Sequence, residues 1–152
     1  MTTIIARNLR FFDIFRNKVI NEKISMIPTM GALHEGHIEL IRKAKEISDI
    51  TIVTIFVNPK QFSNKKDLEN YPSSEKSDIK ILLKLKVDLI YLPNKEDIYP
   101  SDYSTYIKLK KFNDILCAVR RKNHFNGVAT ILVKLFFLIR PDYSLFGEKD
   151  FQ

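Results

Sequence analysis

The sequence predicts an α/β fold with a Rossmann-like, doubly wound parallel sheet. Apolar, β-branched runs alternate along the chain with amphipathic helical segments, which is typical of β-α-β units and of a sheet covered on both faces. Polar clusters at 29–37, 58–61 and 147–150 follow three candidate strands, where ligands of such sheets bind. The length of 152 residues, with 45% hydrophobic and 28% charged residues, suits one globular domain.

The N-terminal part of the chain predicts a helix, a strand and a second helix. Residues 6–19 place apolar side chains at roughly helical spacing. Residues 24–27 form a short apolar run, and we expect Pro28 to end this strand because proline donates no ladder hydrogen bond. Residues 36–47 carry apolar and charged side chains with the period of an amphipathic helix.

The next segments form a clear β-α-β unit. Residues 50–57 (ITIVTIFV) are β-branched and almost uninterruptedly apolar, as in a strand that is buried on both faces of a parallel sheet. Asn58-Pro59 stops this run. Residues 74–86 have the apolar side of a helix, and residues 88–92 predict a third strand.

The C-terminal part predicts two strands and one helix. Residues 104–109 alternate apolar and polar side chains, which favours an edge strand. Residues 128–139 form a strongly apolar helix, and residues 143–146 predict a fourth core strand. The polar run 147–150 leaves the end of that strand.

Composition and charge narrow the class of protein. The single cysteine, Cys117, excludes an internal disulfide framework and fits a reducing cytoplasm. No apolar run reaches the ~18 residues that a membrane helix needs, and the N-terminus lacks a signal-peptide pattern. The net charge of +7 comes mainly from lysines spread along the chain, without an arginine-rich run. We therefore expect a cytoplasmic protein that attracts small anions and has no nucleic-acid or membrane partner.

Two histidines begin the helix after the first polar cluster. Gly31 lets the chain turn sharply, and Gly36 lets a ligand approach the backbone. His34 and His37 are three residues apart, so both imidazoles can point at one object. Exposed backbone N–H groups and the positive helix end favour an anion there. We expect a phosphate chain, to whose oxygens the histidines donate hydrogen bonds.

Two other interpretations of this pair are weaker. The motif is H-E-x-H rather than the H-E-x-x-H of metalloproteases, and His124 and one cysteine are the remaining nitrogen and sulfur ligands, so no zinc site is expected. The alternative is a structural pair packed in a turn. A single histidine would favour that interpretation, whereas two histidines flanked by glycines at a strand end favour a ligand site.

The other two clusters add carboxamides and a charged pair. Asn58 and Gln61 can donate to and accept from the hydroxyls and carboxylates of a small polar substrate. Lys149 can neutralise phosphate charge, and Asp150 can bind ribose hydroxyls or Mg²⁺. Taken alone, the first of these clusters is better explained as an Asn-Pro turn with a solvent-facing glutamine. The second has the alternative of a surface ion-pair turn, which is very common.

Five motifs together resemble the pantoate–β-alanine ligase (pantothenate synthetase) family of the HIGH-motif nucleotidyltransferase superfamily. They are IPTMGALHEGH, TIFVNPKQF, DLENYP, HFNGVATILVKLF and FGEKDFQ, in the order of the family and over nearly the whole chain. The resemblance implies a Rossmann-like enzyme that condenses pantoate with β-alanine. It implies that the pantoate carboxylate attacks the α-phosphorus of ATP and releases pyrophosphate. The amine of β-alanine then attacks pantoyl adenylate, and AMP leaves.

The resemblance also implies roles for individual residues. His37 matches the proton donor, and His34 and Lys149 match the groups near the phosphates. Gln61 matches a glutamine shared by pantoate and β-alanine, with Asn58 beside it. Three further residues match positions around the pocket, namely Tyr71, Arg121 and His124. The ATP-binding residues, with Mg²⁺ accompanying ATP, are Met30, Gly31, Ala32, Leu33, His34, Glu35, Gly36 and His37, and Gly147, Glu148, Lys149 and Asp150.

The chain departs from the family pattern at three places. It has Tyr71-Pro72-Ser73 where the family commonly has YPR, and 121–127 reads RKNHFNG where the family often has RPGHFRG. The family continues after GEKD[FY]Q with a second pantoate-binding Gln, a Ser-Ser-Arg phosphate clamp and a small C-terminal lid domain, whereas this sequence stops at Gln152. We therefore expect 1–152 to be an N-terminal nucleotide-binding domain, truncated before the C-terminal domain, that binds ATP weakly and turns over poorly. The family usually forms homodimers.

Three alternatives stay open on the sequence. Another nucleotidyltransferase of the same fold would make a dinucleotide or a CDP-linked product, although FVNPKQF argues against it. A non-catalytic remnant or binding module would show no ATP binding. A nucleic-acid binder is possible on charge alone and ranks last.

Overall fold

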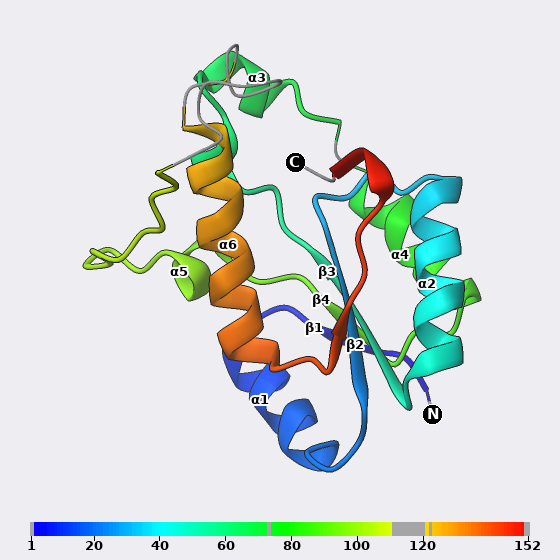
Figure 1. Ribbon diagram of the computed structural model, residues 1–152. Coiled ribbons are helices and arrows are strands. Elements are labelled where there is room, and N and C mark those ends of the chain that lie inside the picture. Colours follow the sequence, from blue (N-terminus) through cyan, green and yellow to red (C-terminus); the bar gives the residue numbers. More distant parts are fainter. Residues whose placement is uncertain (1, 73, 111–120, 122, 151–152) are drawn as a thin grey trace.

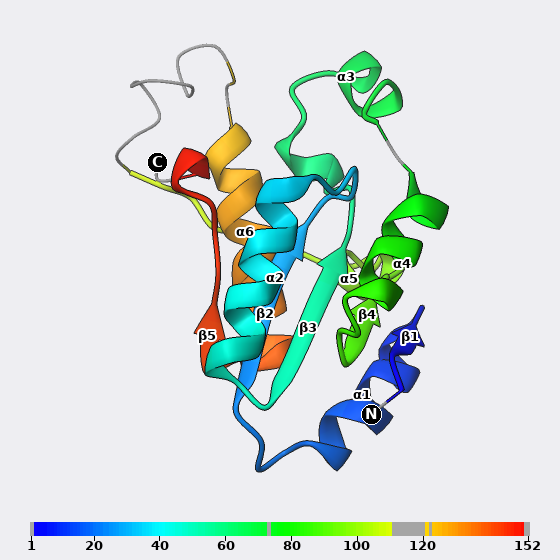
Figure 2. The ribbon, with the colours of Figure 1, turned by 90° about the vertical axis from the view of Figure 1, so that its right-hand side faces the viewer.

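The structure, a computed structural model, describes residues 2–72, 74–110, 121 and 123–150. Its described part forms a five-stranded parallel sheet in the order β1-β4-β3-β2-β5. Figure 2 shows these strands side by side. The strands are β1 (Ile4–Ala6), β2 (Ile24–Thr29), β3 (Ile50–Ile55), β4 (Leu89–Tyr91) and β5 (Tyr143–Ser144).

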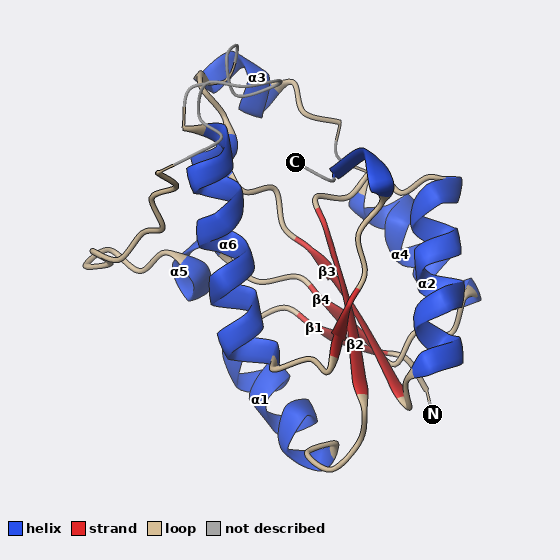
Figure 3. Cartoon of the chain, viewed as in Figure 1, coloured by secondary structure: helices blue, strands red, loops and turns tan. Residues whose placement is uncertain are grey.

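Helices cover both faces of the sheet, as the sequence predicts for a doubly wound fold. Figures 1 and 3 show α1 and α6 on one face and α2 and α4 on the other. The order of strands reverses between β2 and β5, which is where ligands of such sheets bind. The helices are α1 (Leu9–Lys18), α2 (Glu35–Ile47), α3 (Lys65–Glu69), α4 (Glu75–Lys84), α5 (Lys95–Ile98) and α6 (His124–Ile139), with short 3₁₀ turns η1 (Pro59–Gln61) and η3 (Glu148–Asp150).

Two apolar cores hold the layers together. One core joins α1 and α6 to the sheet through side chains such as Phe12, Ile52 and Ile131. The other joins α2 and α4 to the opposite face through side chains such as Ile41 and Leu82. All six residues of β3 are buried, because this central strand lies between both cores. The prediction of a doubly buried strand from ITIVTIFV is therefore confirmed, although the strand ends two residues earlier, at Ile55.

The proline in β2 does not end the strand. Pro28 pairs with Thr54 in register, and β2 continues to Thr29. Met26, two residues before the proline, bonds to the β5 side through Leu145, whereas Thr29 bonds to the β3 side through Phe56. Alternation along the strand directs the Pro28 nitrogen to the β5 side, past the residues that pair with β5. The missing N–H therefore costs no bond to β3.

The predicted edge strand at 104–109 is wrong. This segment has no strand structure, and its backbone bonds to side chains of α6. The Ile107 N–H donates to Thr130 Oγ1, and the Leu109 N–H donates to Asn126 Oδ1, both at 2.9 Å. Ile107 and Leu109, whose backbones bond to α6, are half-buried on either side of the exposed Lys108, which imitates the period of a strand.

The other predictions hold with shifted boundaries. The helices predicted at 6–19, 36–47, 74–86 and 128–139 correspond to α1, α2, α4 and α6, and α6 begins four residues earlier, at His124. The predicted core strand at 143–146 is a two-residue edge strand with an exposed Tyr143. The strand β1 was not predicted, since three residues carry little pattern. Cys117, Ser73 and Lys122 lie outside the described residues.

Among the helices of the described residues, none combines the length and apolar character needed to cross a membrane.

Candidate functional site

The side chains of His34 and His37 both cap the start of α2. The Gly36 N–H donates to Nδ1 of His34 at 3.1 Å, and the His34 N–H donates to Nδ1 of His37 at 3.3 Å. Two N–H groups that a helix start leaves unpaired thus gain partners. The ring centroids lie 4.1 Å apart. Because Nδ1 accepts in both rings, each neutral imidazole carries its proton on Nε2 and donates from there.

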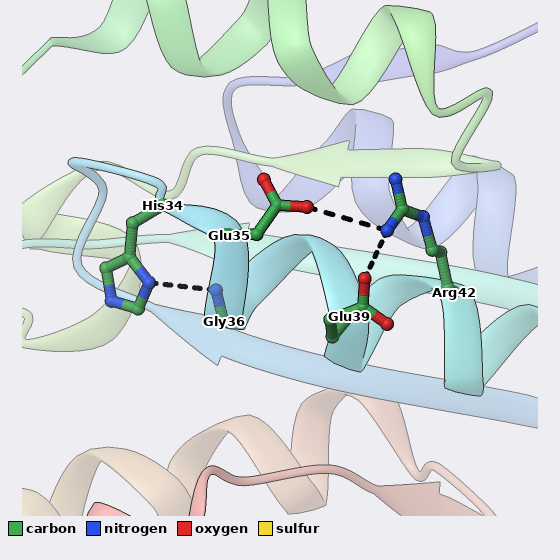
Figure 4. Close-up of polar contacts among 5 residues, drawn as sticks. All are labelled: His34, Glu35, Gly36, Glu39 and Arg42. Carbon is green, nitrogen blue, oxygen red and sulfur yellow. Dashed lines mark hydrogen bonds and ion pairs between the residues drawn. The ribbon is translucent and has the colours of Figure 1, made fainter.

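In the first turn of α2, Gly36 leaves space for the His34 ring, and Glu35 points away from it. A Cβ at Gly36 would lie 3.0 Å from Cε1 of His34, so the close neighbour of this glycine is the imidazole. Figure 4 shows the Glu35 carboxylate directed along α2 to Arg42, at 3.5 Å, which also pairs with Glu39. The carboxylate next to the two histidines therefore has a cationic partner on its own helix.

The pKa of His37 is lowered from its ordinary value. Burial of the ring is the main cause, and electrostatic interactions with His34 and Lys149 add to it. Asp150 and Asp78 oppose this shift. The His37 imidazole is therefore neutral near pH 7. The influence of Lys149 also brings the third polar cluster into the electrostatic neighbourhood of the first.

The loop between β2 and α2 uses its own backbone N–H groups. The N–H groups of Ala32 and Leu33 donate to the carboxylate of Asp78, at 2.9 and 2.8 Å. The Gly31 N–H donates to Thr29 Oγ1 at 3.2 Å. A buried carboxylate and a hydroxyl therefore already accept these three loop N–H groups. The anion site expected from the sequence concerns the N–H groups at the start of α2, and it stays a prediction. The Nε2–H groups of the two imidazoles remain as donors at this loop.

In the second cluster, Asn58 holds Gln61. The Asn58 side chain is 1% exposed, and its amide nitrogen donates to Oε1 of Gln61 (3.1 Å) and to the carbonyl of Gly127 (3.0 Å). Its oxygen accepts from the Tyr99 hydroxyl at 2.8 Å and from the Lys60 N–H at 3.3 Å. With Oε1 of Gln61 engaged, the amide nitrogen of Gln61 is the end that can donate to a ligand.

The start of α6 packs directly on η1. A Cβ at Gly127 would lie 2.2 Å from the carbonyl oxygen of Lys60, so the two backbones approach too closely for any side chain. Nδ1 of His124 lies 2.7 Å from the carbonyl oxygen of Gln61. A carbonyl only accepts, so this ring carries its proton on Nδ1, the opposite tautomer to that of His34 and His37. His124 therefore anchors the backbone of Gln61 to α6.

The remaining predicted residues lie around these clusters. Lys149 pairs with Asp150 at 3.0 Å, and their side chains are 67% and 51% exposed. Tyr71 packs edge-on against Phe62. The pKa of the Tyr71 hydroxyl is raised, mainly by burial, and Lys149 partly opposes this shift. Arg121 is exposed before α6, and its carbonyl accepts from the His124 N–H. Lys149 thus has an electrostatic influence on the pKa of His37 in α2 and on that of Tyr71.

The sequence argument missed Asp78, Tyr99 and Gly127. Asp78 lies four residues before the buried Leu82 on α4, so one carboxylate falls on the apolar stripe of that helix. That position is the signal by which it could have been found. Tyr99 and Gly127 have no comparable signal, because their importance depends on contacts with residues more than 40 positions away.

A family model described as pantoate-beta-alanine ligase matches residues 4–152. The pantothenate synthetase of Thermodesulfovibrio yellowstonii is 50% identical over 148 residues, which are 97% of this chain and 50% of that relative. The pantothenate synthetase of Buchnera aphidicola is 49% identical over 137 residues, or 89% of this chain and 48% of that relative. The chain spans about half the length of the curated relatives it matches.

Two solved structures that are similar to this chain come from the same family. One is the pantoate-beta-alanine ligase from Francisella tularensis complexed with beta-gamma ATP and beta-alanine, with a TM-score of 0.94 and 44% identity over 98% of this chain and 58% of that chain. Another is the pantothenate synthetase from Thermus thermophilus, with a TM-score of 0.89 and 32% identity over 99% of this chain and 53% of that chain.

Proposed function

This chain belongs to the pantoate–β-alanine ligase family, and on that premise we propose that residues 1–152 form the nucleotide-binding domain of such a ligase. The reaction converts pantoate, β-alanine and ATP to pantothenate, AMP and pyrophosphate through pantoyl adenylate. A carboxylate is a poor acyl donor, so adenylation supplies a leaving group for the attack by the β-alanine amine. The protein contributes mainly positioning and stabilisation of charge.

The histidine pair meets the phosphates of ATP. Both rings are held by backbone N–H groups on Nδ1, which supports Nε2–H donors that are oriented before the ligand arrives. During adenylation, charge grows on the phosphate oxygens, and donors fixed in advance stabilise that charge. His37 also has the role of proton donor in this proposal. Lys149 adds a cation, and Asp150 binds the ribose hydroxyls.

Gln61 binds pantoate and β-alanine through its amide nitrogen. This proposal is supported by the Asn58 contact, which engages the oxygen end of the Gln61 carboxamide. Asn58 acts at the pantoate site by holding Gln61, since its own polar atoms face protein partners. Tyr71, Arg121 and His124 contribute to the same substrate site in this proposal, with His124 fixing the backbone of Gln61.

Mg²⁺ accompanies ATP in this proposal. Across the described residues, no group of three or more His, Cys, Asp or Glu side chains could hold a metal ion. Magnesium is commonly held by substrate phosphates, waters and one or two carboxylates. In this proposal the phosphate oxygens of ATP are the main ligands of the Mg²⁺ ion, and the ion neutralises part of the phosphate charge. A cytoplasmic location and a homodimer complete the proposal on the basis of family membership.

The observation that carries the proposal is the pair of adjacent imidazoles at the start of α2, beside the switch point of the sheet, each accepting a backbone N–H on Nδ1. Calorimetric titration of the chain with ATP tests it. We expect a single saturable binding event, and we expect pantoate to bind once a non-hydrolysable ATP analogue is present. Absence of ATP binding to folded protein would contradict the proposal. Loss of pantoate binding but not ATP binding in Gln61→Ala would separate the two subsites.

A further inference from the structure

We propose that Asp78 is a positioning residue that fills the anion-binding turn of the 30–33 loop, so that ATP phosphates are met by imidazole Nε2–H groups rather than by the backbone N–H groups of Ala32 and Leu33. The inference rests on the proposed function, because it concerns how the same loop meets the phosphates of ATP. Asp78 belongs to α4, whereas the histidines begin α2.

The loop has the backbone shape of an anion-binding nest. Gly31 and Ala32 have φ angles of +85° and +52°, both in the left-handed region. Such a turn directs successive N–H groups toward one point, and nests of this kind bind anions. In this protein the N–H groups are those of Ala32 and Leu33, and the anion is the carboxylate of Asp78, with one oxygen on each N–H at 2.9 and 2.8 Å.

The carboxylate also fills the space at the turn. A Cβ at Gly31 would lie 2.9 Å from Oδ2 of Asp78, so the glycine is needed both for its φ angle and for this contact. The Asp78 side chain is 1% exposed. A phosphate oxygen has no access to a nest whose two N–H groups and whose volume are already occupied, and the carboxylate charge would repel it.

The surroundings of Asp78 support a fixed carboxylate. It lies in the first turn of α4, where the helix dipole favours an anion. It stands one helical turn before Leu82, which is fully buried in the core between α2, α4 and the sheet. The carboxylate is therefore attached to a rigid element. Its hydrogen bond fixes the backbone of Leu33, the residue directly before the N-cap His34.

Hydrogen exchange on the unsubstituted chain tests the occupied nest. If Asp78 fills it, the amides of Ala32 and Leu33 are protected from exchange before ATP is added, and ATP changes their protection little. If the backbone binds phosphate instead, both amides exchange fast in the free protein and become protected when ATP binds. That second result would overturn the proposal, whether or not any variant folds.

The Asp78→Asn variant tests positioning. Asparagine keeps the shape but offers one acceptor, and its amide group faces the second backbone N–H. We expect ATP affinity to fall about tenfold or more, the order expected when a charged hydrogen bond is lost. We also expect the imidazole ¹⁵N signals of His34 and His37 to show averaging between tautomers, while His124 is unchanged. Rescue by Asp78→Glu is expected to be partial at most.

The matched control is Leu82→Ala, on the same face of the same helix. It weakens the packing of α4 without removing the carboxylate. At a temperature where both variants are folded, we expect Leu82→Ala to bind ATP as the unsubstituted chain does. Equal loss of ATP affinity in both variants would show that Asp78 acts through general stability. Failure of the unsubstituted chain to bind ATP would count against the proposed function alone, since the exchange and imidazole measurements need no ATP.

Discussion

The imidazoles of His34 and His37 lie 4.1 Å apart, and each accepts a backbone N–H on its Nδ1 atom. In its neutral form, each ring therefore carries its proton on Nε2. This relationship joins a structural role, capping α2, to the binding role that we propose, donation to phosphate. The two roles use different atoms of the same ring and can be separated by substitution.

The variant His34→Asn keeps the cap and removes the Nε2–H donor. Asparagine is among the best helix N-caps and places an oxygen near the position of Nδ1. We expect the free energy of unfolding to change by less than about 0.5 kcal/mol, whereas His34→Ala lowers it by about 1 kcal/mol. We expect both variants to bind ATP about tenfold or more weakly. Thermal unfolding and calorimetry check this, and unchanged ATP affinity in His34→Asn would contradict it.

The variant Gly127→Ala forces α6 away from η1. The added Cβ would overlap the Lys60 carbonyl oxygen at 2.2 Å, and backbone cannot move aside as a side chain can. We expect a loss of about 2–3 kcal/mol in the free energy of unfolding. The control is Gly147→Ala, where the nearest atoms would be 3.7 Å from the Cβ and little change is expected. Denaturant unfolding of both variants measures the difference, and equal stabilities would contradict the close backbone contact.

The variant Tyr99→Phe removes the hydroxyl that donates to Asn58. Burial raises the pKa of Tyr99, so this hydroxyl is a donor at all working pH values. Its loss leaves the buried Asn58 oxygen with one partner fewer, which costs about 1–3 kcal/mol of unfolding free energy. The control is Tyr103→Phe, whose ring packs on that of Tyr99. We expect weaker pantoate binding in Tyr99→Phe than in the control, and identical binding would argue against Asn58 holding Gln61.

Acidification weakens the fold through His37. Its pKa in the folded protein is lowered, chiefly by burial, so the unfolded chain binds more protons in the window below about pH 6.5, the ordinary value for histidine. The contribution of His37 to the free energy of unfolding is fully present above that value and falls as the pH drops through the window. We expect His37→Gln to flatten this part of the curve of unfolding free energy against pH. An NMR titration that finds a His37 pKa above the ordinary value would contradict the prediction.

The sequence could predict the parts of the fold that have a strong local period. Residues 50–57 are apolar on both faces because β3 lies between two cores, and that pattern needs no knowledge of partners. The segment 104–109 misled because contact with α6 imposes the same alternation as a sheet edge. Pro28 misled because its tolerance depends on which neighbouring strand its nitrogen faces.

The candidate site divides in the same way. His34, His37 and Gln61 could be singled out because their residue types and positions after strands carry chemistry on their own. The groups that orient them come from distant elements, as Asp78 does from α4 and Tyr99 from the segment after α5. A carboxylate on an amphipathic helix is usually solvated. The position of Asp78 on the apolar stripe of α4 could therefore mark it as unusual, but its partners in the 30–33 loop are visible only in the folded structure.

Titration of the ¹⁵N-labelled chain with ATP, followed through its three imidazole rings, tests the central claim most directly. We expect the free protein to show His34 and His37 as Nε2–H tautomers and His124 as the Nδ1–H tautomer. We expect ATP to shift the Nε2 signals of His34 and His37 saturably, with a much smaller shift for His124. Saturable ATP binding that leaves the signals of His34 and His37 in place would contradict the account.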